Sequence, residues 1–191
     1  TKNFLRSIVF FPAIVSTLAV GYTFKSLMHP TKGLINTVLA FLGMHGVDWL
    51  GNTKIALYSV IAVDVWKGIG VATVIYIAGI SAISPEFYDA AELDGASGFN
   101  KIRYIIFPLC KSSMNSVIIL SLTAGLRSFD MIYAMTGGGP GFATEVMALS
   151  VYKQYANGFY GLSTAGNVIM LIMIAIIAFP LDRYLRSKEE S

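Results

Sequence analysis

The sequence predicts an all-α protein, a polytopic bundle of helices embedded in a membrane. Of its 191 residues, 55% are hydrophobic and only 13% are charged, which is about half the charged share of a typical soluble domain. The mean hydropathy is +0.65. The apolar residues form continuous runs instead of the alternating pattern of a barrel strand, so helices are the expected way to satisfy the backbone in lipid.

Four segments are apolar over the length that a helix needs to cross roughly 30 Å of hydrocarbon, about 20 residues. They are residues 4–27, 55–83, 112–135 and 161–181. Pro12 lies inside the first segment, and we expect a kink there because proline removes a backbone donor and crowds the preceding turn. The sequence thus predicts one transmembrane domain over residues 1–191, with four spans.

The two segments that connect the first span to the second and the third to the fourth are predicted to lie on one side of the membrane. Residues 33–43 are apolar but too short to cross, which is typical of a helix lying in the interface. The glycine-rich residues 136–141 predict a tight turn. They lack the Gly-Lys-Ser/Thr ending of a phosphate-binding loop and follow a predicted helix, so no nucleotide site is expected in this chain. Tyr152, Tyr155 and Tyr160 are expected to mark the outer membrane interface.

Residues 84–108 form a polar, helix-prone segment between the second and third spans. Ser84 or Ser81 can cap a short helix whose first turns are acidic, which suits the positive end of a helix. Ala90 and Ala91 are small enough to let another surface approach closely, and Gly95 permits a left-handed exit from the helix. The segment therefore predicts a short, rigid helix between two spans.

The Lys and Arg residues predict which side of the membrane this segment occupies, because cytoplasmic flanks carry the excess. With residues 84–108 inside, the cytoplasmic set is Lys2, Arg6, Lys101, Arg103, Lys111, Arg183, Arg186 and Lys188, and the outer set is Lys25, Lys32, Lys54 and Lys153. The larger set is inside, so the segment is predicted to be cytoplasmic.

The same segment closely resembles the cytoplasmic coupling loop of membrane subunits in ABC importers. The family pattern reads Glu-Ala-Ala, three residues, Gly, nine residues, Ile, one residue, Leu-Pro. Here Asp89-Ala90-Ala91, Gly95, Ile105 and Phe107-Pro108 stand at those spacings. Further short matches in residues 10–12, 33–36, 48–51, 64–67 and 129–140 look like carbohydrate-importer permeases related to the maltose-system membrane subunits.

This resemblance implies the fold and the partners of a type I ABC importer permease core in a bacterial or archaeal cytoplasmic membrane. The expected partners are a second permease subunit, two ATPase subunits, an extracellular or periplasmic solute-binding protein, the carbohydrate substrate and membrane lipid. ATP and Mg would bind the ATPase partner, and no cofactor is expected in this chain. Because such permeases usually have six or more spans, we expect the chain to lack one or two helices at its start.

The resemblance also implies a contact between the short helix and the ATPase. We expect the contact to centre on small residues and to include acidic ones; the predicted set is Glu86, Asp89, Ala90, Ala91, Asp94 and Gly95.

Two pairs of opposite charges fall inside predicted spans, each pair three residues apart: Asp64 with Lys67, and Arg127 with Asp130. Such a pair shares a helix face and can partly neutralise itself. At 1.5 Å per residue, Arg127 would lie roughly 15 Å into its span, near the bilayer midplane where transporters commonly bind substrate. Structural pairing is the alternative role for these charges.

We predict a carbohydrate path from the polar and aromatic residues near this depth. Trp66 would stack on the apolar face of a sugar, and Asn167 would either pack between helices or contact substrate. Because Arg127 could pair with a phosphate, a glycerol phosphate-type substrate is the alternative to a sugar. The candidate residues are Trp66, Arg127, Asp130, Tyr133 and Asn167.

Other functions are disfavoured by what the sequence lacks. Cys110, His29 and His45 are too far apart in sequence to suggest a metal site, and the scattered basic residues do not suggest nucleic-acid binding. No Gly-x-Ser-x-Gly or paired histidine suggests an enzyme, so no catalytic residue is assigned. The alternative function is an ion-gradient-driven secondary transporter or channel, which transport without an ATPase would reveal.

Overall fold

The computed structural model describes residues 2–189, without the side chains of residues 2, 3 and 5. Residues 1, 190 and 191 of the predicted domain, and the side chain of Lys2, therefore lie outside the described part. All regular elements among the described residues are helical. Two of these helices, α4 (Ala56–Ser81) and α11 (Tyr160–Ser187), are long and apolar enough to cross a membrane, and two bent pairs could make two further spans.

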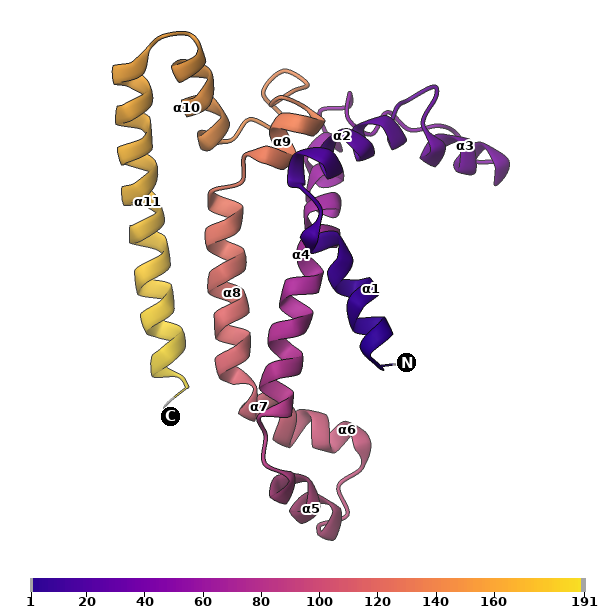
Figure 1. Ribbon diagram of the computed structural model, residues 1–191, viewed down its shortest axis with the longest axis vertical. Coiled ribbons are helices and arrows are strands. Elements are labelled where there is room, and N and C mark those ends of the chain that lie inside the picture. Colours follow the sequence, from indigo (N-terminus) through magenta and orange to yellow (C-terminus); the bar gives the residue numbers. More distant parts are fainter. Residues whose placement is uncertain (1, 190–191) are drawn as a thin grey trace.

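The helices run roughly along one axis, with short elements across both ends (Figure 1). α4 stands in the centre, between α1 (Lys2–Ile14) and α8 (Lys111–Leu126), and contacts both. Beyond α8 stands α11. One end carries α2, α3, α9 and α10, and the opposite end carries a helical hairpin that begins with α5.

The first predicted span is not one kinked helix. α1 ends at Ile14 and α2 runs from Thr17 to Leu27, and the two axes meet at 98°. Pro12 lies inside α1 and is buried, so the break falls beyond the proline where a kink was expected. α1 packs along α4 because Gly70 leaves room for its backbone: a Cβ on Gly70 would stand 2.5 Å from the carbonyl oxygen of Val9.

The third predicted span, residues 112–135, is also interrupted. α8 ends at Leu126, and a separate short helix, α9 (Asp130–Met135), follows at an angle. α9 packs on α2, where Gly21 lets the two helices meet: an added Cβ would stand 2.5 Å from the Cβ of Ala134. Met131 and Met135 of α9 are almost fully buried in the main apolar core, so tertiary burial ends the span early.

A buried amide organises the segment between α2 and α4, which contains α3 (Leu34–Phe41). Asn36 is 6% exposed. Its Nδ2 donates to the carbonyl oxygens of Pro30 and Val47 at 2.9 and 2.8 Å, and its Oδ1 accepts from the backbone amide of Val47 and from Nε1 of Trp49 at 3.1 and 3.0 Å. The short helix predicted here is thus present and is held by one side chain.

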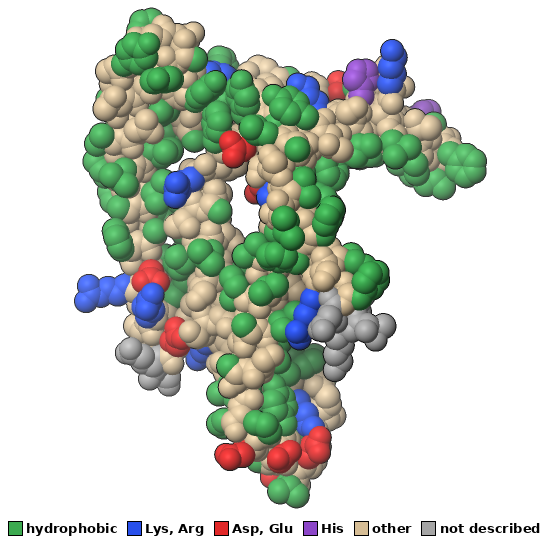
Figure 2. Space-filling view, in the orientation of Figure 1, with side chains coloured by type: hydrophobic (Ala, Val, Ile, Leu, Met, Phe, Trp, Pro, Cys, Tyr) green, Lys and Arg blue, Asp and Glu red, His purple; other side chains and the backbone are tan. Residues whose placement is uncertain are grey.

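α3 keeps an apolar face uncovered within this chain. Leu34, Val38 and Phe41 are exposed, with Phe41 at 91%. In the space-filling view, apolar side chains line one side of this arm, and basic side chains and histidines stand on the other (Figure 2). The division is the one expected of a helix that lies in a membrane interface.

The hairpin at the opposite end consists of α5 (Pro85–Leu93), α6 (Gly98–Lys101), the π-helical turn η1 (Ile102–Ile106) and α7 (Phe107–Leu109). The axis of residues 98–109 then bends by 66° into α8. The start of α8 and the end of α11 lie at the same end of the molecule as the hairpin (Figure 1). The basic residues predicted to be cytoplasmic on these three elements are therefore gathered at one end.

The chain returns from α9 through a glycine-rich turn and α10 (Met147–Ala156) to α11. The predicted tight turn is present. Gly137, Gly138 and Gly141 have φ of 61°, 95° and 59°, which favour glycine. Thr144 is buried and donates from its Oγ1 to the carbonyl oxygen of Gly139 at 2.8 Å, which closes the turn.

We predict that Asn36→Ala destabilises the protein by roughly 1–3 kcal/mol, because the change leaves buried backbone groups and an indole N–H without their partner. Thermal unfolding of the purified protein in detergent, followed by Trp49 fluorescence, measures the effect. Thr37→Val is the matched control. Thr37 is the exposed neighbour of Asn36, and the change removes its hydrogen bond to the carbonyl oxygen of Gly33. Equal melting temperatures for the two variants would show that Asn36 does not organise this segment.

Candidate functional site

The hairpin presents a short helix whose ends are fixed by local sequence. Pro85 occupies the first turn of α5, where its missing N–H costs nothing, and Glu86 follows it. Ser84 is the N-cap residue, but its side chain makes no capping hydrogen bond, contrary to our expectation. Gly95 has a φ of +69°, and the amide of Ala96 donates to the carbonyl oxygen of Ala91 at 2.9 Å, so the predicted left-handed exit is present.

The predicted contact residues do not all face outward. Glu86, Asp89, Ala90, Asp94 and Gly95 are exposed. Ala91, in contrast, is only 6% exposed and is turned toward the rest of the chain. Successive residues of a helix are rotated by about 100°, so Ala91 can point into the hairpin while Ala90 points out.

The hairpin also exposes large apolar side chains that the sequence pattern did not single out. Leu93 is 89% exposed, Phe99 is 70% exposed and Phe87 is 51% exposed. The space-filling view shows an apolar tip bordered by acidic side chains (Figure 2). An exposed apolar patch with a charged border is typical of a protein contact surface. The signal available in the sequence was the presence of Phe and Leu inside an otherwise polar segment.

An ion pair joins the two arms of the hairpin. Nζ of Lys101 on α6 lies 2.6 Å from Oε1 of Glu92 on α5. The hydrogen bond from Lys101, and then its positive charge, lower the pKa of Glu92 below the ordinary glutamate value. Glu92 is exposed, so the pair holds the relative position of the arms without contributing much stability.

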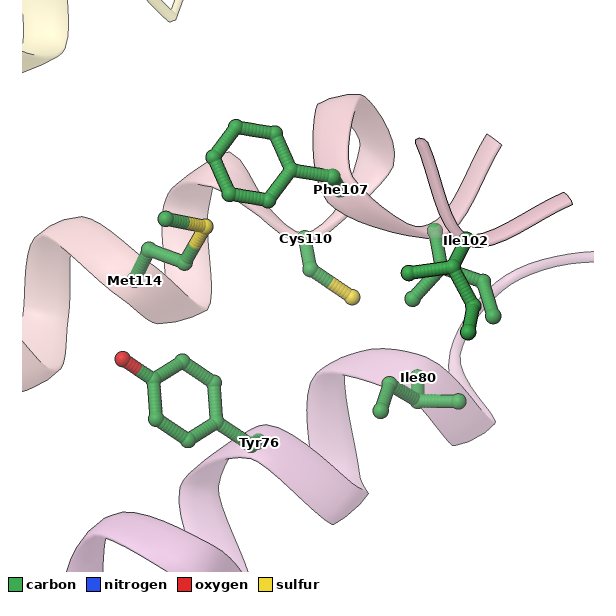
Figure 3. A pocket seen from close by; sticks show the side chains of 7 residues that line it. Tyr76, Ile80, Ile102, Phe107, Cys110 and Met114 are labelled. Atoms are coloured by element: carbon green, nitrogen blue, oxygen red, sulfur yellow. The ribbon is translucent and has the colours of Figure 1, made fainter. Parts of the chain in front are cut away.

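The hairpin leaves the bundle through an apolar joint between α4 and α8. A cavity of about 270 Å³ lies there, lined by Tyr76, Ile80, Ile102, Ile106, Phe107, Cys110 and Met114. In Figure 3, Tyr76 and Ile80 of α4 face Met114, Cys110 and Phe107 across this space. Beside it, Gly79 lies so close to Ser113 that any Cβ on Gly79 would overlap the serine side chain. The two helices therefore touch directly at the point where the hairpin begins.

At the other end of the bundle, three aromatic rings form a cluster, and two of them border a cavity. Phe129 stacks on Tyr133 at a centroid distance of 5.3 Å and an interplanar angle of 19°, and Tyr152 lies 5.1 and 5.4 Å from the two rings. A cavity of about 360 Å³ adjoins the cluster, lined by Phe129, Ala148, Val151, Tyr152, Tyr155, Ser163 and Asn167. We call this cavity the outer aromatic pocket.

The chemistry of the outer aromatic pocket combines ring faces, phenols and an amide. The hydrogen bond between the phenols of Tyr133 and Tyr152, and then their electrostatic interaction, raise the pKa of Tyr152 above the ordinary tyrosine value. Tyr152 is therefore neutral at physiological pH and keeps its O–H. Together with the Asn167 amide, such groups suit a neutral ligand that has both hydroxyl groups and apolar faces.

The pocket brings together only some of the predicted substrate-path residues. Asn167 lines it and Tyr133 belongs to the ring cluster beside it. Trp66 on α4 does not line the pocket: its ring lies 5.2 Å from the ring of Phe24 on α2. Tyr152 and Tyr155, expected to mark the interface, also line the pocket. Their spacing of three residues on α10 was the signal that they share a face.

Arg127 and Asp130 do not form the expected pair. Arg127 is the C-cap residue of α8, a helix of 16 residues or about 24 Å, and so stands at a helix end instead of in the middle of a continuous span. Within the described part of the chain, no ion pair within 4.0 Å joins Arg127 to Asp130 or Asp64 to Lys67. Nζ of Lys67 donates to the carbonyl oxygen of Ala13 at 3.4 Å, because α1 packs against that part of α4.

The chain resembles permease proteins of sugar transport systems over nearly its whole length. A sequence model of the family described as "Binding-protein-dependent transport system inner membrane component" matches residues 1–189. The trehalose/maltose transport system permease protein MalF of Thermococcus litoralis is 35% identical, over 97% of this chain and 64% of that protein. The multiple sugar-binding transport system permease protein MsmF of Streptococcus mutans is 32% identical, over 93% of this chain and 61% of that protein.

Two solved structures share the fold. A bacterial ABC transporter for import of the acidic polysaccharide alginate contains a chain with a TM-score of 0.87 and 22% identity, covering 97% of this chain and 65% of that one. The alginate transporter in complex with its alginate pentasaccharide-bound periplasmic protein gives a TM-score of 0.89 at 22% identity, covering 99% and 66%. This chain spans 64% of the first of these curated relatives and 65% of the first matched structure.

We predict that Gly95→Ala loosens the C-terminal turn of α5 by roughly 1–2 kcal/mol, because a Cβ disfavours the left-handed backbone while meeting no atom within 4 Å. Hydrogen exchange of amides 88–96 should then speed up by about tenfold. Gly98→Ala is the control: it also has open space around its Cβ, but Gly98 does not have a positive φ. Unchanged exchange in Gly95→Ala would contradict the role of this turn.

Proposed function

Because the chain belongs to the family of binding-protein-dependent transport system inner membrane components, we propose that it is the permease part of an ATP-driven carbohydrate importer. The chain would form the route of a sugar or oligosaccharide across the membrane and couple that route to a separate ATPase. Its family places it in a membrane. We further propose that the chain crosses the membrane several times and that this membrane is a bacterial or archaeal cytoplasmic membrane.

The observation that carries the proposal is the protruding hairpin. It stands clear of the bundle and exposes Leu93 and Phe99 beside the acidic Glu86, Asp89 and Asp94. It emerges where α4 and α8 touch each other at Gly79 and Ser113. Apolar side chains would enter a groove of the ATPase and the carboxylates would meet basic groups around it. Movement of the ATPase would then turn the hairpin as a unit.

The proposed assembly contains further partners. They are a second permease subunit, two ATPase subunits and a periplasmic or extracellular solute-binding protein. α4 and α11 are only partly buried within this chain, so their exposed apolar surface is available to a permease partner and to lipid. The alginate transporter, solved with a periplasmic protein that holds a pentasaccharide, supports the binding-protein partner. ATP and Mg would be held by the ATPase subunits, and this chain would perform no catalytic step.

The outer aromatic pocket is the proposed carbohydrate site. Aromatic rings of Phe129 and Tyr152 offer faces to the C–H groups of a sugar, and Asn167 offers a donor and an acceptor to its hydroxyls. The sugar transport systems named for the relatives support this class of substrate. Arg127 and Asp130 are exposed at the junction of α8 and α9 and remain candidates for contact with substrate or its ring substituents.

We predict that Leu93→Asp separates the permease from its ATPase. The side chain is 89% exposed, so the change should leave folding intact while placing a charge in the apolar contact, weakening association by at least about tenfold. Co-purification of the ATPase with the permease measures this. Phe142→Ser, which changes an 84% exposed side chain at the opposite end, should not alter co-purification. Equal recovery of ATPase with both variants would refute the proposed contact.

We predict that Asn167→Leu lowers ATP-dependent sugar uptake by about tenfold or more, because sugar hydroxyls would lose their partner in a site built to bond them. Uptake of labelled sugar by liposomes containing the assembled importer is the measurement. Thr164→Val on the same helix is the control and should transport normally, because the Oγ1 of Thr164 bonds only to the carbonyl oxygen of Tyr160 within α11.

The same uptake measurement tests the alternative function. Uptake that proceeds without the ATPase and stops when an ion gradient is dissipated would favour a secondary transporter instead.

A further inference from the structure

The last helix is held to the rest of the described chain mainly near its two ends. Only 6% of the apolar stretch of α11 that is long enough to cross a membrane is buried within the described chain. Near its first turn, Oγ of Ser163 donates to the carbonyl oxygen of Val151 on α10 at 3.1 Å, and Gly166 packs so closely that an added Cβ would stand 2.7 Å from Cγ2 of Val151. That attachment adjoins the outer aromatic pocket, which Ser163 and Asn167 both line.

The other attachment consists of hydrogen bonds between the first turns of α8 and the end of α11. Nδ2 of Asn115 donates to the carbonyl oxygen of Leu185 at 3.2 Å and to Oε2 of Glu189 at 3.1 Å. Nζ of Lys111 donates to the carbonyl oxygen of Lys188 at 3.3 Å. We call this set of bonds the α8–α11 junction.

These bonds satisfy groups that a helix cannot satisfy by itself. The last carbonyls of a helix have no partner within it. The amide of Glu189, which would bond Leu185 in a continuing helix, instead bonds the carbonyl oxygen of Arg186 at 2.9 Å, and Asn115 supplies the missing donor to Leu185. Ser112 also bonds Glu189; the bonds from Ser112 and Asn115 lower the pKa of this carboxyl, so it accepts as a carboxylate.

The α8–α11 junction lies at the point where the hairpin passes into the bundle. Lys111 directly follows Cys110, at which the chain bends by 66° from α7 into α8. α11 then runs as one helix of 28 residues, about 42 Å, from this junction to the outer aromatic pocket. One continuous helix, which contains Pro180, thus connects the root of the hairpin with one wall of the proposed sugar site.

We propose that the α8–α11 junction makes α11 follow the hairpin, so that movement imposed on α5 reaches the wall of the outer aromatic pocket that carries Asn167. This inference rests on the proposed function of the hairpin. Lys111, Ser112 and Asn115 act as positioning residues: through their bonds to the end of α11 they determine whether α11 moves with α8.

The test is the Asn115→Asp variant in the complete importer, reconstituted in liposomes with its permease partner, ATPases and binding protein. Aspartate has nearly the same size but lacks the N–H donors and carries a charge opposite Glu189 and the carbonyl of Leu185. We expect ATP hydrolysis to continue while the number of sugar molecules moved per ATP falls by about tenfold, within the range typical of coupling between sites. Thr123→Val is the matched control, because its lost bonds lie within α8.

A distance measurement separates coupling from simple support. Spin labels at Leu162 and Phe142, both exposed at the outer end, report whether α11 moves when ATP binds. We expect the distance to change in the unaltered importer and in Thr123→Val, and to stay constant in Asn115→Asp. If Asn115→Asp does not assemble, Glu189→Ala at an exposed position tests the same bond, with a lower sugar yield per ATP expected.

The outcomes distinguish the two proposals. An Asn115→Asp or Glu189→Ala importer with full sugar yield per ATP and unchanged α11 movement would overturn the role of the junction and leave the proposed function intact. Absence of ATP-dependent uptake in the unaltered assembly would overturn the proposed function, and the role of the junction with it.

Discussion

Direct contact between helices at glycine determines how the parts of this chain are arranged. Gly70 accepts the backbone of α1 on one side of α4, Gly79 accepts Ser113 of α8, and Gly21 lets α2 lie against Ala134 of α9. In lipid the hydrophobic effect does not drive helices together, so close van der Waals contact of this kind is what holds them. α4 thereby becomes the central element to which both the first helix and the hairpin root are attached.

The consequence is an open arrangement with much apolar surface left uncovered. The buried core gathers at the outer end, where α9 packs against α2 and α4, and Met131 and Met135 fill it. Along the rest of α4 and α11, apolar side chains such as Val65 and Leu171 remain exposed within the chain. In a membrane this surface is available to lipid and to other helices.

The two regions to which we assign a function by proposal lie at the two ends of the bundle. The hairpin begins where α4 touches α8 at Gly79 and Ser113, and the pair of Glu92 with Lys101 joins its two arms. The outer aromatic pocket is fixed by stacked rings and by α10. Between them, the continuous helix α11 and the bonds of Asn115 provide a physical connection. An importer needs such a connection because the free energy of ATP hydrolysis is released on one side of the membrane and the substrate arrives from the other.

The sequence by itself determined the helical class, the approximate position of the apolar segments, the polar hairpin and its left-handed glycine, since these depend on composition and local backbone preference. It did not determine where the apolar runs at residues 4–27 and 112–135 break: both look continuous in the sequence, but in the structure α1 and α8 pack on α4 while α2 and α9 pack on each other. For the same reason the sequence did not show that Arg127 caps the end of α8 or that Ala91 is buried within this chain. Which side chains meet at a pocket, such as Phe129, Tyr152 and Asn167, is decided by the tertiary structure, because contacts between distant segments leave no local periodic signal.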